Sequence, residues 1–207
     1  MSHLFSLIVT DTSPLITLVL ADSLDVLLCP MLPVSIPDAV YTEATRVRGA
    51  PGAGQIVEWI NDNLAQVRIV PTETGIDQQR RLEEGRSIRS LGELAALEVL
   101  DRFLDANQEA EALLLFEDAD VAKRRAIVDE RVGMISTGDF LRELEGAGLI
   151  ESASGILEKA ARAGRNINQQ LQLQSDHRDT YLALRQQIAT RASWAGKTVA
   201  SHPAVST

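Results

Sequence analysis

The chain has 207 residues, of which 45% are hydrophobic and 24% are charged, and its formal net charge is −9. This length suits one α/β domain with an appendage, and the acidic balance argues against a passive nucleic-acid-binding module, which would carry a bulk positive field. The same balance is compatible with an enzyme that meets nucleic acid through metal ions and a local basic patch.

The chain has a single cysteine, Cys29, which excludes an intrachain disulfide and a Cys/His zinc pattern. The apolar stretch 15–28 is interrupted by Asp22 and Asp25, so it is too short and too charged to span a bilayer. We therefore expect a cytoplasmic protein with no membrane segment.

Strands and helices are predicted to alternate along the first 150 residues. Short apolar runs predict strands at 7–10, 34–36, 67–70, 112–116 and 132–135. Apolar periodicity and helix-opening residues predict helices at 14–22, 37–46, 56–64, 91–104, 121–127 and 140–147. The polar stretch 72–90 predicts a loop or an irregular helix. This alternation is typical of a parallel sheet with helices on both faces, in which ligands bind at the edge formed by the strand carboxyl ends.

The composition changes beyond residue 150, where helices are expected at 156–163, 169–174 and 178–192. The expected organisation is therefore a domain of residues 1–150, a helical extension at 151–192 and a flexible tail at 193–207.

Several carboxylates break the apolar patterns. Asp11 stands between the strand at 7–10 and the helix that follows it, and Glu43 and Glu93 fall on the apolar faces of their helices, where a charge is costly unless it is paired. The apolar positions sharing those faces are Ile36, Val40, Ala44 and Val47 in the first helix and Leu97, Leu100 and Leu104 in the second. Glu98, by contrast, is expected to be solvated.

More acids follow the later strands: Glu117, Asp118 and Asp120 after the fourth, and Asp139 after the fifth. Like charges brought to about 4 Å repel by roughly 4 kcal/mol per pair at an effective dielectric near 20, and a divalent cation would relieve this repulsion. Ligands that are all oxygen favour Mg²⁺ or Mn²⁺.

Each carboxylate also has a purely structural interpretation. Asp11 would cap the next helix, in competition with Thr12 and Ser13. Ser90 and Glu93 would form a capping box, and Glu43 would pair with Arg46. The remaining structural alternatives are helix caps formed by Asp118, Asp120 and Asp139, the last in competition with Thr137.

The segments "VTDTSPLITL", "SIPDAVYTEA", "SLGELAALEVL", "ALLLFEDADVAKRRA" and "GMISTGDFLRELEGAGLI" together resemble a PIN domain, over about residues 7–150. The similarity is to VapC-type toxin ribonucleases and related uncharacterised PIN proteins. It implies a three-layer α/β/α sandwich with a central parallel sheet, to which this chain would add C-terminal helices, and a Mg²⁺- or Mn²⁺-dependent ribonuclease.

The resemblance also implies roles for individual residues. The catalytic acids would be Asp11, Glu43, Glu93 and Asp118, with Glu117 and Asp120 as alternatives to the last. Asp11, Glu93 and Asp118 would bind the metal, Asp139 would do so through water, and Glu43 would hold a metal-bound water or act as base. Thr12, Ser13 and Thr137 would support the ligands from outside the metal's immediate ligand set.

The most concentrated basic patch consists of Lys123, Arg124 and Arg125, which we expect to contact RNA phosphates, although a solvated helix face is the alternative. A homodimer is expected from the family, and toxin function would require a small antitoxin partner. Two other readings compete with the ribonuclease: a PIN-like interaction module without catalysis, and a toprim-like phosphotransfer site built on Asp118 and Asp120.

Overall fold

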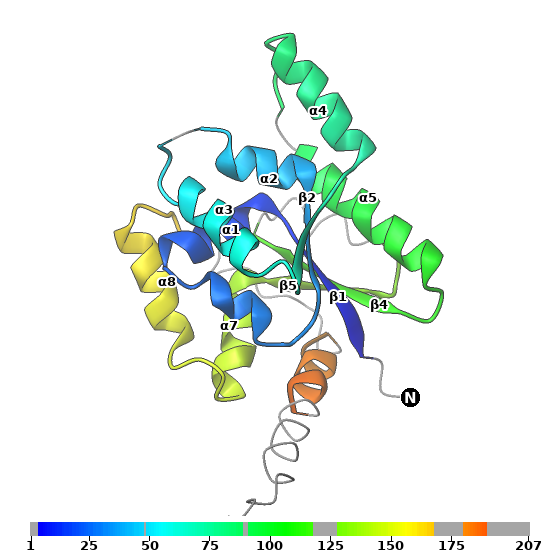
Figure 1. The fold of residues 1–207 in the computed structure, drawn as a ribbon. Helices are drawn as coiled ribbons and strands as arrows, with labels where there is room; N and C mark the ends of the chain where they lie inside the picture. The colour runs from blue at the N-terminus through cyan, green and yellow to red at the C-terminus, as the bar shows by residue number, and fades with distance from the viewer. Residues whose placement is uncertain (1–3, 48, 89–90, 118–127, 168–179, 190–207) are drawn as a thin grey trace, which may run out of the picture.

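The computed structural model describes residues 4–47, 49–88, 91–117, 128–167 and 180–189. Its centre is a five-stranded sheet with the order β3-β2-β1-β4-β5, in which every pairing is parallel (Figure 1). The strands are β1 (Phe5–Thr10), β2 (Val34–Pro37), β3 (Val67–Val70), β4 (Glu111–Phe116) and β5 (Val132–Ser136). The predicted parallel sheet is therefore confirmed.

The sheet has a topological switch point at β1. This strand pairs with β2 on one side and with β4 on the other, so the chain leaves β1 in one direction and later returns to its opposite flank. Ligands bind at such points in open α/β sheets because the connections diverge there and leave room above the strand ends. Asp11 follows β1 and Glu117 follows β4, so both lie at this point.

Alternating side chains of the strands divide the core between the two faces of the sheet, as period-two geometry requires. Ile8, Leu113 and Ile135 belong to a cluster on one face, and Leu7 and Leu114 to a second cluster on the other. The first cluster also takes apolar residues from α1, α3, α7 and α8, whereas the second takes them from α5 (Figure 1). The molecule is thus the predicted three-layer α/β/α sandwich.

The helices largely follow the sequence prediction. The elements are α1 (Thr12–Leu20), the 3₁₀ helix η1 (Leu24–Leu28), α2 (Asp38–Thr45), α3 (Ala53–Asp62), α4 (Glu73–Glu83), α5 (Leu91–Ala106), α7 (Thr137–Gly146) and α8 (Ala153–Arg162). Because α2 ends at Thr45, Val47 lies outside the helix and is 54% exposed, and its predicted place on the buried stripe was wrong.

Residues 72–90 differ from the prediction, because most of them form the regular helix α4. The Thr72 side chain caps it by accepting a hydrogen bond from the amide of Gly75. Gln78 is the one buried residue of this helix, which projects from the rest of the fold (Figure 1). The large apolar residues of α4 are Ile76 and Leu82, which lie six residues apart and form no apolar stripe, so the sequence does not mark it as a core-facing helix.

Two described segments beyond residue 150 pack on the domain. Ala153 and Leu157 of α8 and Leu184 and Ile188 of the helical stretch 180–189 belong to the first core cluster. The expected flexible tail and the predicted helices at 121–127 and 169–174 lie outside the described residues. Among the described helices, none is long and apolar enough to cross a membrane.

Candidate active site at the acidic sheet edge

Asp11 lies at the end of β1, directly before α1. Its backbone amide donates a 3.1 Å hydrogen bond to the carbonyl of Leu115, so the β1–β4 ladder itself fixes its position. Asp11 occupies the N-cap position of α1, but its side chain makes no capping hydrogen bond to that helix. The structure therefore does not show Asp11 capping α1. The Asp11 carboxylate interacts with other groups instead.

Glu43 projects from α2 and joins three other elements. One carboxylate oxygen, Oε2, accepts a 2.8 Å hydrogen bond from the hydroxyl of Thr12 in α1. The other, Oε1, accepts from the amide of Gly92 in α5 at 3.1 Å and from the side chain of Gln78 in α4 at 3.4 Å. Among the described residues it forms no ion pair with Arg46, so the structural alternative proposed for Glu43 was wrong. Its place at the N-terminus of α5 suits an anion, because that end of a helix carries partial positive charge.

Gly92 opens a small space between these carboxylates. A Cβ atom at residue 92 would lie 2.8 Å from Oε2 of Glu43, 3.0 Å from the hydroxyl of Thr12 and 3.3 Å from Oδ1 of Asp11. Only a residue without a side chain fits there without displacing one of these groups. The strand end, α2 and α5 thus converge on a cradle lined by oxygen atoms, which we call the Gly92 cradle.

The electrostatics of Asp11 show that further acids lie close to it. Burial raises the pKa of Asp11 from 3.8 to about 6; the backbone amide of Thr12 lowers it, and the charges of Glu43, Glu93 and Glu117 raise it further. Glu93 lies in the first turn of α5, next to Gly92, and one of its carboxylate oxygens is fully buried. The sequence-predicted Asp11, Glu43 and Glu93 are therefore brought together at one edge.

Glu117 follows β4 and is held by two side chains. Its Oε2 atom accepts hydrogen bonds from the hydroxyl of Thr17 and from the guanidinium of Arg165, each at 2.9 Å. Arg165 also donates to the backbone carbonyl of Ser13 at 3.3 Å. Glu117 thus has a cationic partner in Arg165.

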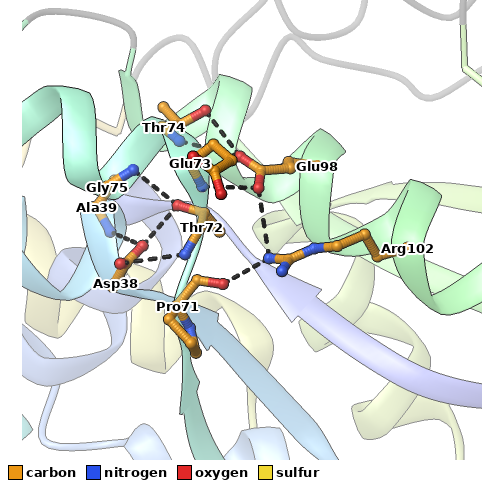
Figure 2. A network of polar contacts seen from close by, with 9 residues as sticks. All are labelled: Asp38, Ala39, Pro71, Thr72, Glu73, Thr74, Gly75, Glu98 and Arg102. Carbon is orange, nitrogen blue, oxygen red and sulfur yellow. Dashed lines mark hydrogen bonds and ion pairs between the residues drawn. The ribbon is translucent and has the colours of Figure 1, made fainter.

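A second polar network fixes α4 beside the cradle (Figure 2). Asp38 of α2 accepts hydrogen bonds from the amide and the hydroxyl of Thr72, at 3.2 and 2.6 Å. Glu98 of α5 accepts from the amides of Glu73 and Thr74 at 2.8 and 3.1 Å, which satisfies the free N-terminal amides of α4. The expectation that Glu98 is merely solvated was therefore wrong: it ties α4 to α5, and α4 delivers Gln78 to Glu43.

Asp139 faces a different set of groups. Its Oδ2 accepts hydrogen bonds from Ser136 at 2.9 Å and from Tyr181 at 2.6 Å, and its other oxygen pairs with Arg142. Ser136, and neither Asp139 nor Thr137, is the residue that caps α7. The charge of Asp139 is not among those that shift Asp11. A metal-linked role for it stays a prediction, with no support from these contacts.

The predicted supporting residues serve other partners. The hydroxyl of Thr12 binds Glu43, whereas its backbone amide lowers the pKa of Asp11, and Ser13 contributes its carbonyl to Arg165. Thr137 is completely buried, and its hydroxyl has no hydrogen-bond partner among the described residues.

Part of the predicted site lies outside the described residues: Ser90 of the proposed capping box, Asp118 and Asp120, and the basic patch of Lys123, Arg124 and Arg125. Their roles stay predictions.

The donor set at the cradle fits a hard divalent cation. It consists of carboxylate oxygens with a hydroxyl beside them, and a methyl group at residue 92 would come within 2.8 Å of Oε2 of Glu43. Within the described ranges, no three His, Cys, Asp or Glu side chains already form a ready-made ligand group. Asp11 and Glu93 would hold a cation after side-chain adjustments, with Glu43 beside them, and any ligand from residues 118–127 would add to them.

Sequence reasoning missed two groups, Gln78 and Arg165. Gln78 lies in a helix without apolar periodicity, and Arg165 follows a surface helix in a segment of mixed polarity. Their partners lie 35 and 48 residues away along the chain, so no local pattern could have identified them.

A family model described as a PIN domain matches residues 7–175. Neither the curated proteins nor the solved structures contain a match to the chain.

Proposed function

Since the chain belongs to the PIN-domain family, whose fold is of the nuclease type, we propose that it is a divalent-metal-dependent ribonuclease acting at the acidic sheet edge. The observation that carries the proposal is the Gly92 cradle, where Asp11 and Glu43 meet across a space too small for a methyl group. The choice of RNA as substrate rests on the family resemblance.

The electrostatics support a cation site rather than a passive cluster of acids. Burial and three other carboxylates raise the pKa of Asp11 to about 6. The charged form of this carboxyl group is therefore less stable in the protein than it would be in water. Perturbed carboxyl groups of this kind are frequent in functional sites, because a bound cation or a proton transfer relieves the repulsion.

The residues divide into two roles. Asp11 and Glu93 would bind the cation, together with Asp118 if it reaches the cradle. Glu43, fixed by Thr12 and Gly92, would accept a proton from the attacking water or hold that water in line with the phosphorus. A bound Mg²⁺ or Mn²⁺ supplies an acidified water and charge stabilisation at the phosphate. The hydrogen bonds to Glu43 keep its carboxylate oriented, so that little reorganisation is needed during the reaction.

The partners in this proposal are an RNA substrate, contacted by the basic residues 123–125, and a second copy of the chain in a homodimer. A small antitoxin protein would add a basic segment that occupies the acidic edge. A cytoplasmic location would bring the enzyme to its RNA.

The test is cleavage of a mixed RNA pool by the purified chain with Mg²⁺ or Mn²⁺, beside samples containing EDTA. Asp11→Asn should abolish cleavage, whereas Asp62→Asn should not, because Asp62 lies exposed at the end of α3 on another part of the surface. Cleavage that persists in EDTA or in Asp11→Asn would contradict the proposal. A parallel single-stranded DNA pool shows whether the enzyme distinguishes RNA.

The second candidate is an interaction module with a PIN-like fold and no catalysis. It is favoured by the lack of a ready-made ligand group within the described ranges. A folded chain that binds Mn²⁺ yet cleaves no RNA in any pool would support this candidate over the ribonuclease.

A further inference from the structure

Arg165 brings a positive charge from the C-terminal part of the chain to the acidic edge. A Schellman-type helix end aims it there: Gly164 adopts a φ of +96°, and the amide of Arg165 bonds the carbonyl of Ala160 at 3.0 Å. The helix that ends here, α8, packs against α1, so the turn faces the end of α1 that carries Asp11.

The guanidinium closes a ring of hydrogen bonds with two other side chains. Arg165 donates to the hydroxyl of Thr17 and to Oε2 of Glu117, each at 2.9 Å, and Thr17 in turn donates to the same Oε2 atom at 2.9 Å. A third bond, to the carbonyl of Ser13, fixes the first turn of α1. A planar group with donors on several sides can make all these bonds at once, whereas a lysine ammonium cannot match this geometry.

The pair lies deep enough for its charges to matter. The side chain of Glu117 is 3% exposed and that of Arg165 is 25% exposed, so solvent screens them poorly. The charge of Glu117 already reaches Asp11, since it raises the pKa of that residue. Arg165 places an opposite charge on that same carboxylate, and its bond to the carbonyl of Ser13 lies two residues from Asp11 along the chain.

We infer that Arg165 is a positioning residue and a fixed counter-charge of the acidic edge: its bonds to Glu117, Thr17 and Ser13 offset one negative charge and set the cation affinity of the Gly92 cradle. The inference rests on the proposed function, because it assumes that the cradle binds a divalent cation. It assigns Glu117 to this ion pair instead of to the metal, and it gives the C-terminal segment a role in the site.

The test is a titration of the metal-free chain with Mn²⁺, in which electron paramagnetic resonance measures the concentration of the free ion. Arg165→Met removes the charge and keeps a long side chain, so Mn²⁺ should bind about three- to tenfold more tightly, because the loss of a positive charge beside the acidic edge strengthens its attraction for a cation. Glu117→Gln should weaken binding by a similar factor, and the double variant should return close to the wild-type affinity.

Two further variants separate charge from structure. Arg165→Lys keeps the charge, so its Mn²⁺ affinity should stay near that of the wild type. Arg162→Met is the matched control, since the side chain of Arg162 is 79% exposed and pairs with Glu158 one turn earlier in α8. A role limited to holding the fold together predicts weaker binding in Arg165→Met, which is the opposite sign.

The outcomes distinguish this inference from the proposed function. Unchanged or weaker Mn²⁺ binding in folded Arg165→Met, or unchanged binding in Glu117→Gln, overturns the inference even if the wild type cleaves RNA. Mn²⁺ binding that follows the expected order in a chain that cleaves no RNA supports the inference and contradicts the ribonuclease. A wild type that binds no Mn²⁺ at millimolar concentration overturns both.

Discussion

Thr12 and Glu43, which lie 31 residues apart in the sequence, are joined by a 2.8 Å hydrogen bond from the Thr12 hydroxyl to Oε2 of the glutamate. This contact links the first turn of α1 to the middle of α2 across the carboxyl end of β1. Since Asp11 directly precedes Thr12, the bond also sets the distance between the two carboxylates that border the Gly92 cradle. The geometry of the acidic edge therefore depends on a neutral side chain.

Replacing Thr12 by valine should slow RNA cleavage about tenfold, which corresponds to roughly 1.4 kcal/mol, because a hydrogen bond to a carboxylate is lost while the shape is kept. Single-turnover cleavage rates at saturating Mg²⁺ measure this. Thr42→Val is the control, since Thr42 lies in α2 and its side chain makes no hydrogen bond in the described structure. Equal rates for the two variants would show that the Thr12 contact is dispensable.

Gly92→Ala should weaken both Mn²⁺ binding and cleavage by about tenfold or more. The new methyl group would lie 2.8 Å from Oε2 of Glu43, and because that oxygen ends a flexible side chain, the carboxylate would move away from Thr12. The free energy of unfolding should change little, since alanine gains up to about 1 kcal/mol over glycine in a helix and offsets part of the strain.

Gly54→Ala is the matched control for Gly92→Ala. Each glycine is the second residue of its helix, but a Cβ atom at residue 54 would have nothing within 4 Å. Binding and cleavage should be unaffected in this variant. If Gly92→Ala kept wild-type Mn²⁺ affinity as well, the cradle would not be the cation site.

Asp11→Asn should stabilise the metal-free protein at pH 8 and have little effect near pH 4. The pKa of Asp11 is raised from 3.8 to about 6 in the folded state, so the stability gained from its protonation is complete below about pH 4 and is lost as the pH rises through 6. At pH 8 the charged carboxylate costs at most about 3 kcal/mol, since each pKa unit corresponds to 1.36 kcal/mol. Urea unfolding of both proteins in EDTA at the two pH values measures the difference. An equal effect at pH 4 and pH 8 would contradict the raised pKa.

Glu98→Gln should destabilise the protein by about 1 kcal/mol at pH 7 and make α4 more sensitive to trypsin at Arg80 and Arg81. Burial acts to raise the pKa of Glu98, but the amides of Glu73 and Thr74, the Thr74 hydroxyl and Arg102 together lower it below its usual range. The stabilisation is therefore complete above the ordinary glutamate pKa of 4.5 and is lost as the pH falls through the lower pKa of the folded state.

The trypsin experiment has a matched control in Glu58→Gln, because Glu58 is exposed on α3 and has no such bonds in the described structure. Faster cleavage within α4 in Glu98→Gln alone is the expected result. Similar digestion of the two variants would mean that the contacts of Asp38 with Thr72 hold α4 without help from Glu98.

The sequence by itself determined the layered architecture and three members of the site. Apolar runs and helix-opening residues identified the strands and most helices, because burial on a sheet or on one helix face imposes a local period that the residues must follow. Asp11, Glu43 and Glu93 were recognisable for the same reason: each is a charge placed where that period calls for an apolar side chain. The helix α4 escaped this reasoning because it buries only Gln78 and has too few apolar residues to form a core-facing stripe.

Only the tertiary structure decided which groups those charges meet. Three sets of contacts depend on where separate elements cross. Glu43 binds Thr12 and Gly92, Glu98 caps α4, and Arg165 pairs with Glu117. The physical reason is that hydrogen bonds and close ion pairs form at about 3 Å, whereas their partners here are separated by 24 to 49 residues of chain. Local patterns record which side chains are buried, and the packing of helices on the sheet decides what they are buried against.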